Sequence, residues 1–200
     1  MSTAALAARP GVLADRLVAR SSRVTDVVLV VTGAVVVGLL AQVTIPMWPV
    51  PITGQTLGVI LVGGALGMRR GAAALTTYLA AGLAGVPWFA GFAGGPAYVL
   101  APSFGFIVGF VAAAAVAGWF AERAWDRRPL LAMVGFCLAT VTPFVVGVPW
   151  MAAVLGLSDP ATIAAYGVTP FIVPGLVKAA LAAAAFPLAW RLIRAVDGSA

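Results

Sequence analysis

Long runs of hydrophobic positions dominate the chain, and short segments rich in arginine, proline or glycine separate them. A helical run of about 20 apolar residues matches the ~30 Å hydrocarbon core of a bilayer. The pattern predicts an all-α integral membrane protein with six transmembrane helices within residues 24–192, between tails at 1–23 and 193–200. The expected spans are Val24–Gln42, Ile52–Met68, Gly71–Trp88, Ser103–Ala121, Leu130–Leu155 and Pro170–Leu192.

The second span is the shortest of the six. Its uniformly apolar part, Leu57–Met68, is too short to cross a core of about 30 Å as a helix. This helix therefore either begins within Pro49–Thr56 or is partly re-entrant.

Composition supports the membrane class and argues against nucleic acid as a partner. The chain is 62% hydrophobic and 9% charged, whereas soluble domains carry roughly 25% charged residues. The net charge is +6, but the arginines lie at the ends of the predicted helices and form no basic face. A chain of this composition is expected to be surrounded by membrane lipid.

The arginines predict the orientation of the chain. Six spans place all eleven arginines and both termini on one side of the membrane, and the opposite side carries only Asp159. These arginines are Arg9, Arg16, Arg20, Arg23, Arg69, Arg70, Arg123, Arg127, Arg128, Arg191 and Arg194. Because cytoplasmic loops are enriched in Lys and Arg, we expect both termini to be cytoplasmic. The outer loops 43–56, 85–102 and 156–169 are longer, and we expect them to fold over the outer mouth of the bundle.

Several kinds of chemistry are missing from the sequence. It has no histidine, and the predicted spans hold no Asp or Glu except at their ends. Metal sites and proton relays normally need such groups, so we expect no metal, no cofactor and no enzymatic activity. The only lysine is followed by Ala179, so no Gly-Lys-Ser/Thr loop is present and this motif cannot supply ATP-driven transport.

That lysine, Lys178, lies inside the last apolar span. A lone ammonium at membrane depth is costly and suggests a functional site. Pro174 suits the first turn of a helix, so we expect the helix to begin near it and to leave free amides at Gly175–Val177 beside the ammonium. Such amides and an ammonium together would bind an anion, for example a carboxylate ligand. The alternative is a lysine whose side chain reaches the outer interface.

Polar and aromatic residues of the outer loops provide further candidates. Gln55, Thr53 and Thr56 suit a neutral head group that donates and accepts hydrogen bonds, or they satisfy broken backbone groups. The outer tryptophans Trp48 and Trp88, with Trp150, either contact ligand or anchor the chain at the interface.

Two small residues, Ala34 and Gly38, lie four positions apart on the first span. This spacing puts them on one helix face and permits close helix–helix approach. The face either packs within the chain or docks on another membrane subunit.

Five groups of residues form a specific pattern along the chain. They are Ile45-Pro46 with Pro49–Gly58, Arg69-Arg70-Gly71, Gly82–Phe92 with Gly94-Gly95, Pro102–Phe106 with Gly109-Phe110, and Gly167–Phe171 with Lys178-Ala179. This pattern resembles the BioY family, the biotin-binding S components of energy-coupling factor (ECF) transporters. The resemblance covers about residues 25–190 in collinear order.

The resemblance implies a six-helix S component in a bacterial or archaeal cell membrane. It implies biotin as the ligand, with an ECF transmembrane T subunit and ABC-type ATPase subunits as partners. The carboxylate of biotin would meet Lys178 and its ureido ring would lie near Gln55, with Ala34 and Gly38 docking the T subunit. The expected substrate-binding residues are Lys178, Gln55, Thr53, Trp88, Phe89, Gly91, Gly94, Tyr98, Phe171 and Trp150.

The chain departs from the family pattern at three places. Pro174-Gly175 stands where the family usually has Gly-Asp, Phe106 replaces a common tyrosine, and Gly91 occupies a position that is sometimes Asn. The missing acid leaves Lys178 without its usual neighbour.

The sequence leaves two other functions open. One is an S component for another small carboxylate. The other is a self-sufficient carrier driven by an ion gradient, for which backbone carbonyls would have to bind the coupling ion. A structural assembly subunit without a ligand explains the lysine poorly.

Overall fold

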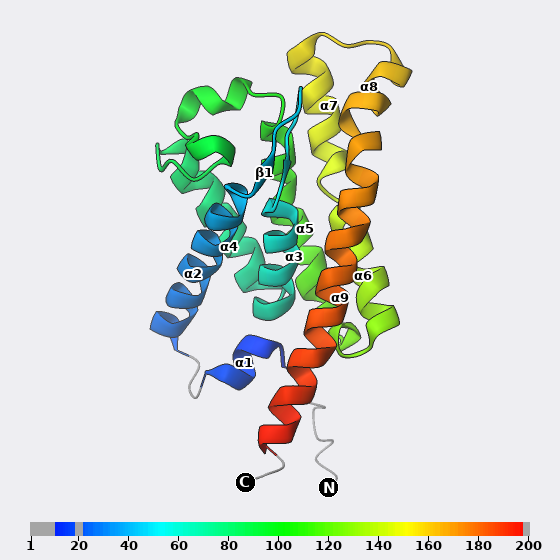
Figure 1. Cartoon of the computed structure of the whole chain (residues 1–200). Helices are drawn as coiled ribbons and strands as arrows, with labels where there is room; N and C mark the ends of the chain where they lie inside the picture. The colour runs from blue at the N-terminus through cyan, green and yellow to red at the C-terminus, as the bar shows by residue number, and fades with distance from the viewer. Residues whose placement is uncertain (1–10, 19–21, 198–200) are drawn as a thin grey trace, which may run out of the picture.

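The computed structural model describes residues 11–18 and 22–197 as a bundle of helices (Figure 1). The helices are α1 (Leu13–Leu17), α2 (Arg23–Ala41), α3 (Gln55–Leu66), α4 (Met68–Leu83), α5 (Phe104–Ala121), α6 (Pro129–Val141), α7 (Phe144–Leu155), α8 (Pro160–Gly167) and α9 (Thr169–Asp197). Short 3-10 turns are η1 (Ala90–Phe92), η2 (Pro96–Leu100) and η3 (Trp125–Arg127). Strands β1 (Thr44–Ile45) and β2 (Ile52–Thr53) form an antiparallel hairpin.

The core of the bundle forms around α3 and α5. One buried cluster joins these helices to α2 and α4, and includes Val37, Val59, Leu75 and Phe110. A second cluster joins them to α6 and α9 through residues such as Phe136 and Phe186. Small residues allow α3 and α5 to approach closely, since a Cβ built on Gly63 would lie 2.4 Å from the Ala114 carbonyl oxygen.

Four helical segments within the described part of the chain are long and apolar enough to cross a membrane. They are Arg23–Ala41, Phe104–Ala121, Pro129–Leu155 and Pro160–Ala195. The chain is therefore a membrane protein built mostly of helices. The second predicted span contains a short helix, as expected. This helix, α3, has 12 residues and is about 18 Å long at 1.5 Å per residue.

Several elements differ from the sequence prediction. The fifth predicted span divides into α6 and α7 around Thr142 and Pro143. The segment 156–169, predicted to be a loop, contains α8. The Asp159 carboxylate caps its first turn and accepts from the Thr162 amide at 2.8 Å. The loop 43–56 carries the β1–β2 hairpin rather than irregular backbone alone.

The predicted start of the last helix near Pro174 is wrong. Helix α9 begins at Thr169 and continues through both Pro174 and Pro187. A proline inside a helix removes one backbone bond and crowds the preceding turn, but it does not have to end the helix. The amides of Gly175–Val177 therefore lie within the helix and are not free to bind an anion.

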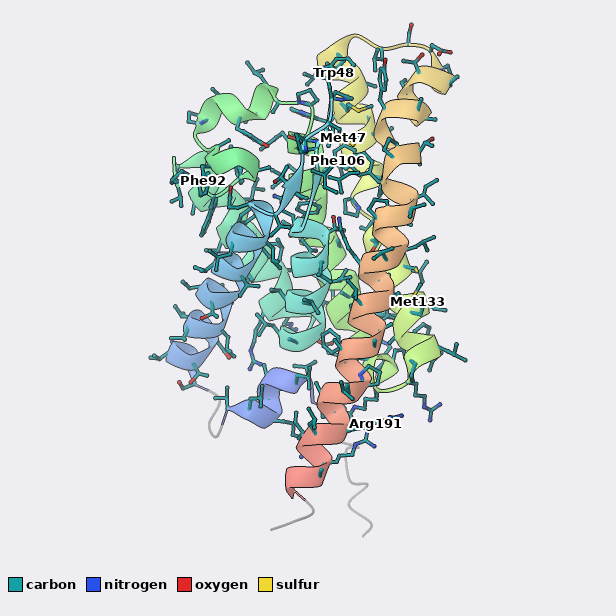
Figure 2. All side chains as sticks on the ribbon, in the orientation of Figure 1. Met47, Trp48, Phe92, Phe106, Met133 and Arg191 are labelled. Atoms are coloured by element: carbon teal, nitrogen blue, oxygen red, sulfur yellow. The ribbon has the colours of Figure 1, made fainter. Side chains whose placement is uncertain are left out.

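The arginine-bearing ends of the elements gather at one end of the bundle. Arg70 forms ion pairs with Asp15 at 2.7 Å and Asp26 at 2.8 Å, which tie α4 to α1 and α2. Arg191 lies at this end, opposite Met47 and Trp48 of the hairpin (Figure 2). Arg9 and Arg20, which entered the orientation argument, lie outside the described residues.

Candidate functional site

A central cavity lies at the end of the bundle where the hairpin is found. The β1–β2 hairpin, α3, α5, α9 and the α6–α7 junction surround it. Its walls are Val50, Pro51, Thr53, Gln55, Thr56, Ala90, Tyr98, Ser103, Phe106, Ile107, Phe110, Thr140, Pro143, Phe144, Phe171, Gly175 and Lys178. The cavity has room for a few water molecules.

Lys178 reaches this cavity from the middle of α9. Its side chain is half-buried, and its Nζ donates to the Thr53 backbone carbonyl at 2.7 Å. An ammonium has three protons, so this contact leaves two for a ligand. Among the described residues, the ion pairs formed by Asp and Glu involve Arg70 and not Lys178. Within the described part of the chain, one backbone oxygen therefore holds Nζ of this lysine at the cavity.

A hydrogen-bonded chain of three side chains lies beside the lysine. The Thr53 hydroxyl donates to Gln55 Oε1 at 2.7 Å, and Gln55 Nε2 donates to the Tyr78 hydroxyl at 2.8 Å. All three residues are buried, and both Thr53 and Gln55 line the cavity. Helix α3 begins at Gln55, so the side-chain amide of Gln55 lies at the junction between the hairpin and α3.

Tyr78 is the functional candidate that the sequence analysis missed. It lies on α4, is 0% exposed, and its hydroxyl donates to the Trp88 carbonyl at 3.1 Å. The sequence offers only a general indication of its role, because any tyrosine buried in an apolar span needs a partner for its hydroxyl. Only the fold identifies that partner, because Gln55 is 23 positions away.

Aromatic rings form the apolar wall of the cavity. Phe106 of α5 packs against Phe144 of α7 and Phe171 of α9, with ring centroids 5.6 and 6.0 Å apart. Figure 2 places Phe106 just below Met47 and Trp48 of the hairpin loop. Tyr98 closes another side, and its hydroxyl lies 3.0 Å from the Ser103 hydroxyl. Such a wall suits a flat apolar ring system with a few polar groups at its edges.

The hairpin loop covers the cavity through its own side chains. Val50 is 5% exposed and packs in a cluster with Phe106 and Met151. Trp48 is mostly exposed, and its ring meets the ring of Tyr166 on α8 edge-on, with centroids 5.2 Å apart. The hairpin therefore contacts both the interior and α8.

The structure brings half of the predicted binding residues to the cavity wall. Lys178, Gln55, Thr53, Tyr98 and Phe171 all line it. Thr56, which the sequence grouped with Gln55 and Thr53, lines it too. Thr140, Phe144 and Ser103 also line it and were not predicted to bind a ligand.

The remaining predicted binding residues lie outside the cavity wall. Trp88 packs on Tyr78, and Phe89 is fully buried between the rings of Tyr78 and Tyr98. Trp150 packs on Phe104. Gly91 and Gly94 are exposed in the segment between α4 and α5.

The small residues of α2 face the interior of the bundle. Ala34 is 0% exposed, and a Cβ built on Gly38 would lie 3.1 Å from the Trp88 Cβ. This is the packing within the chain that the sequence left open. The neighbouring face of α2, which carries Val31, Val35 and Leu39, is exposed.

Comparison with known proteins finds one family and several relatives. The profile of the BioY family matches residues 14–195. A protein named "Probable biotin transporter BioY" from Pyrococcus horikoshii is 35% identical over 157 residues, which cover 78% of this chain and 91% of that one. A "Biotin transporter BioY" from Rhizobium etli is 36% identical over 168 residues, covering 79% and 89%.

A solved structure has the same fold. The crystal structure of the S-component for biotin from an ECF-type ABC transporter superposes with a TM-score of 0.70. The match covers 88% of this chain and 95% of that one, at 22% sequence identity.

Proposed function

This chain belongs to the BioY family, and from that premise we propose that it is the biotin-binding S component of an ECF transporter. It captures biotin from outside the cell and is a transport subunit rather than an enzyme. The curated relatives that match it over most of their length are named as biotin transporters.

The observation that carries this proposal is the placement of two different polar groups on one apolar cavity. Lys178 offers an ammonium, and Gln55 offers an amide that both donates and accepts. Biotin has a carboxylate at the end of an apolar tail and a neutral cyclic urea at its ring system. An ammonium forms a charge-assisted hydrogen bond with the carboxylate, and an amide is complementary to the urea.

We further propose six membrane-spanning segments with both termini in the cytoplasm of a bacterial or archaeal cell. In this arrangement α2, α3, α4, α5, α6–α7 and α9 cross the membrane, and the hairpin faces outside. Arg70 lies in the first turn of α4, and Arg191 lies near the C-terminal end of α9. These positions support this orientation because segments rich in arginine at helix ends stay in the cytoplasm.

The energy for transport comes from partner subunits in this proposal. The chain has no phosphate-binding Gly-Lys-Ser/Thr motif, so ATP would be hydrolysed by ABC-type ATPase subunits joined through a transmembrane T subunit. Because Ala34 and Gly38 are buried, a partner that contacts α2 meets its exposed face at Val31, Val35 and Leu39.

Binding of labelled biotin to the purified chain in detergent tests the proposal. We expect saturable binding with one site per chain, displaced by excess unlabelled biotin and not by unrelated vitamins. Absence of saturable binding at micromolar biotin would exclude biotin as the ligand. Displacement by a different small carboxylate instead would assign the same site to that ligand.

Reconstitution separates an S component from a self-sufficient carrier. Proteoliposomes that contain only this chain should bind biotin without accumulating it under an imposed ion gradient. Accumulation by the chain alone would favour the gradient-driven carrier.

A further inference from the structure

We propose that Tyr78 is a positioning residue that fixes which end of the Gln55 amide faces which part of the ligand. The hydroxyl of Tyr78 does not line the cavity, so it acts through Gln55. This inference rests on the proposed biotin site and adds to it the residue that sets recognition of the urea.

The direction of each hydrogen bond follows from one backbone carbonyl. The Trp88 carbonyl can only accept, so the Tyr78 hydroxyl uses its single proton in the 3.1 Å bond to that oxygen. The Tyr78 oxygen, 2.8 Å from the end of the Gln55 side chain, must then accept. Only the amide nitrogen can donate to it, so Nε2 faces Tyr78 and Oε1 faces Thr53.

The Thr53 hydroxyl agrees with this direction. It accepts from the Gln55 backbone amide at 3.3 Å, and it donates its proton to Gln55 Oε1 at 2.7 Å. If the Gln55 amide were reversed, its nitrogen would point at Thr53, and the hydroxyl proton of this buried residue would lose its acceptor. A buried donor without a partner is costly, so both ends of the network select the same orientation.

The Trp88 carbonyl is itself held by groups away from the cavity. Gln42 Nε2, at the end of α2, donates to it at 3.2 Å, and the Trp88 indole Nε1 donates back to the Tyr78 carbonyl at 2.9 Å. The ring of Tyr78 packs against the rings of Trp88 and Phe89. The network is therefore anchored in α2 and α4 before any ligand arrives.

The consequence is a fixed donor–acceptor order at the cavity wall. Gln55 keeps one Nε2 proton and one Oε1 lone pair that the network does not use. A cyclic urea presents a carbonyl acceptor beside N–H donors, so it fits this order in one orientation. An amide free to rotate would serve a ligand of the opposite pattern equally well.

The variant Tyr78→Phe tests this with three ligands: biotin, desthiobiotin and 2-iminobiotin. Desthiobiotin keeps the urea, whereas 2-iminobiotin has a guanidinium donor in place of the urea carbonyl. In the variant only Thr53 still orients Gln55, so the preference for one orientation weakens by roughly one hydrogen bond. We expect the ratio of the 2-iminobiotin Kd to the biotin Kd to fall about fivefold. The ratio for desthiobiotin should stay unchanged.

The ratios distinguish positioning from a structural role. A merely structural tyrosine would weaken all three ligands by one factor, and that result, or no change at all, would overturn the inference. Ratios measured on one preparation do not depend on the fraction of active protein. If Tyr78→Phe fails to fold, Thr53→Val removes the opposite anchor of the amide and should produce the same fall in the 2-iminobiotin ratio.

A matched control is Tyr166→Phe, which removes the hydroxyl of a tyrosine outside the cavity wall and keeps its ring against Trp48. Its three Kd values should keep the wild-type ratios. If the wild-type chain does not bind biotin, the proposed function fails. If it binds biotin and Tyr78→Phe leaves the ratios unchanged, only the role of Tyr78 fails.

Discussion

In the proposed site, recognition of an anion depends on the contact between Lys178 and Thr53. The ammonium already donates to the Thr53 carbonyl, so an entering carboxylate adds to that bond or replaces it. A carboxylate makes a stronger hydrogen bond with an ammonium than a neutral carbonyl does. The Thr53 hydroxyl also donates to Gln55 Oε1, so one residue of β2 contacts both the ammonium and the amide that the proposed ligand would meet.

The substitution Lys178→Met tests the ionic part of this contact. It keeps an unbranched side chain and removes the charge, so biotin should lose about 1.5–3 kcal/mol of binding free energy, or roughly 10- to 150-fold in Kd. Biotin methyl ester has no carboxylate, and its Kd should change little. Isothermal titration of both ligands against both proteins measures the coupling. Equal losses for biotin and its ester would mean that Lys178 does not contact the carboxylate.

At the scale of the elements, the short α3 is held in the centre of the bundle by backbone contact with α5. A Cβ on Gly63 would meet the Ala114 carbonyl oxygen at 2.4 Å, and one on Gly118 would meet the Gly67 carbonyl carbon at 2.3 Å. Backbone atoms cannot rotate away as a side chain can. The position of Gln55, at the start of α3, therefore depends on glycines far from the cavity.

The variant Gly63→Ala should destabilise the bundle by about 1–3 kcal/mol because it overpacks the α3–α5 contact. Gly135→Ala on α6 is the matched control, since the atoms nearest to its Cβ would belong to the Phe120 side chain, the first at 3.1 Å, and not to backbone. Both changes gain up to about 1 kcal/mol of helix propensity, so the difference between them isolates the clash. Thermal unfolding in detergent measures it. A Tm for Gly63→Ala equal to that of Gly135→Ala would contradict the close contact.

At the scale of the whole molecule, a buried polar cluster closes the end opposite the cavity. Asp126 of η3 is 1% exposed and accepts a hydrogen bond from the Trp190 indole of α9. Arg127 stacks over the Trp190 ring at 4.0 Å and donates to the Gly11 carbonyl at 2.9 Å. These contacts connect the α5–α6 turn, α9 and the segment before α1.

Stability should depend on pH through Asp126. Burial raises the pKa of this carboxyl above its usual range, more than the Trp190 hydrogen bond and nearby Arg127 lower it. A folded-state pKa above the unfolded value gives stability that is complete below about pH 4 and is lost as pH rises through the raised pKa. Asp126→Asn should therefore flatten the fall of Tm with rising pH.

Asp159 provides a control of the opposite sign. The Thr162 hydroxyl and amide lower the pKa of its carboxyl, so its contribution appears above the unfolded pKa and is lost as pH falls. Asp159→Asn should therefore remove a rise of Tm with pH. If Tm changes with pH in the same way for wild type and Asp126→Asn between pH 4 and 8, burial does not raise the pKa of Asp126.

The proposed orientation predicts which loops reagents reach from outside. In a Cys137→Ser background, Asp159→Cys should react with an impermeant maleimide on intact cells, because α8 would face outside. Arg128→Cys should react only after the membrane is opened. Labelling of Arg128→Cys on intact cells would reverse the orientation.

The amino-acid sequence alone was enough to identify the class of the protein and its most unusual residue. Apolar runs identified a helical membrane protein because hydrocarbon leaves few other structures for a spanning chain, and the segments around Pro49–Gly58 and Gly82–Phe92 pointed to the BioY family. Lys178 and Gln55 were identifiable because a charge or an amide among apolar residues needs a reason. Both residues line the same cavity in the structure.

The residues that complete the cavity became known from the folded chain and not from the sequence. In the fold, α9 continues through Pro174, and Trp88, Phe89 and Trp150 lie outside the cavity wall. Tyr78, from another helix, contacts Gln55. Periodicity and composition report the face and the depth of a residue. The partner of a buried hydroxyl depends instead on how separate helices pack, and that information is spread over contacts distant in the sequence.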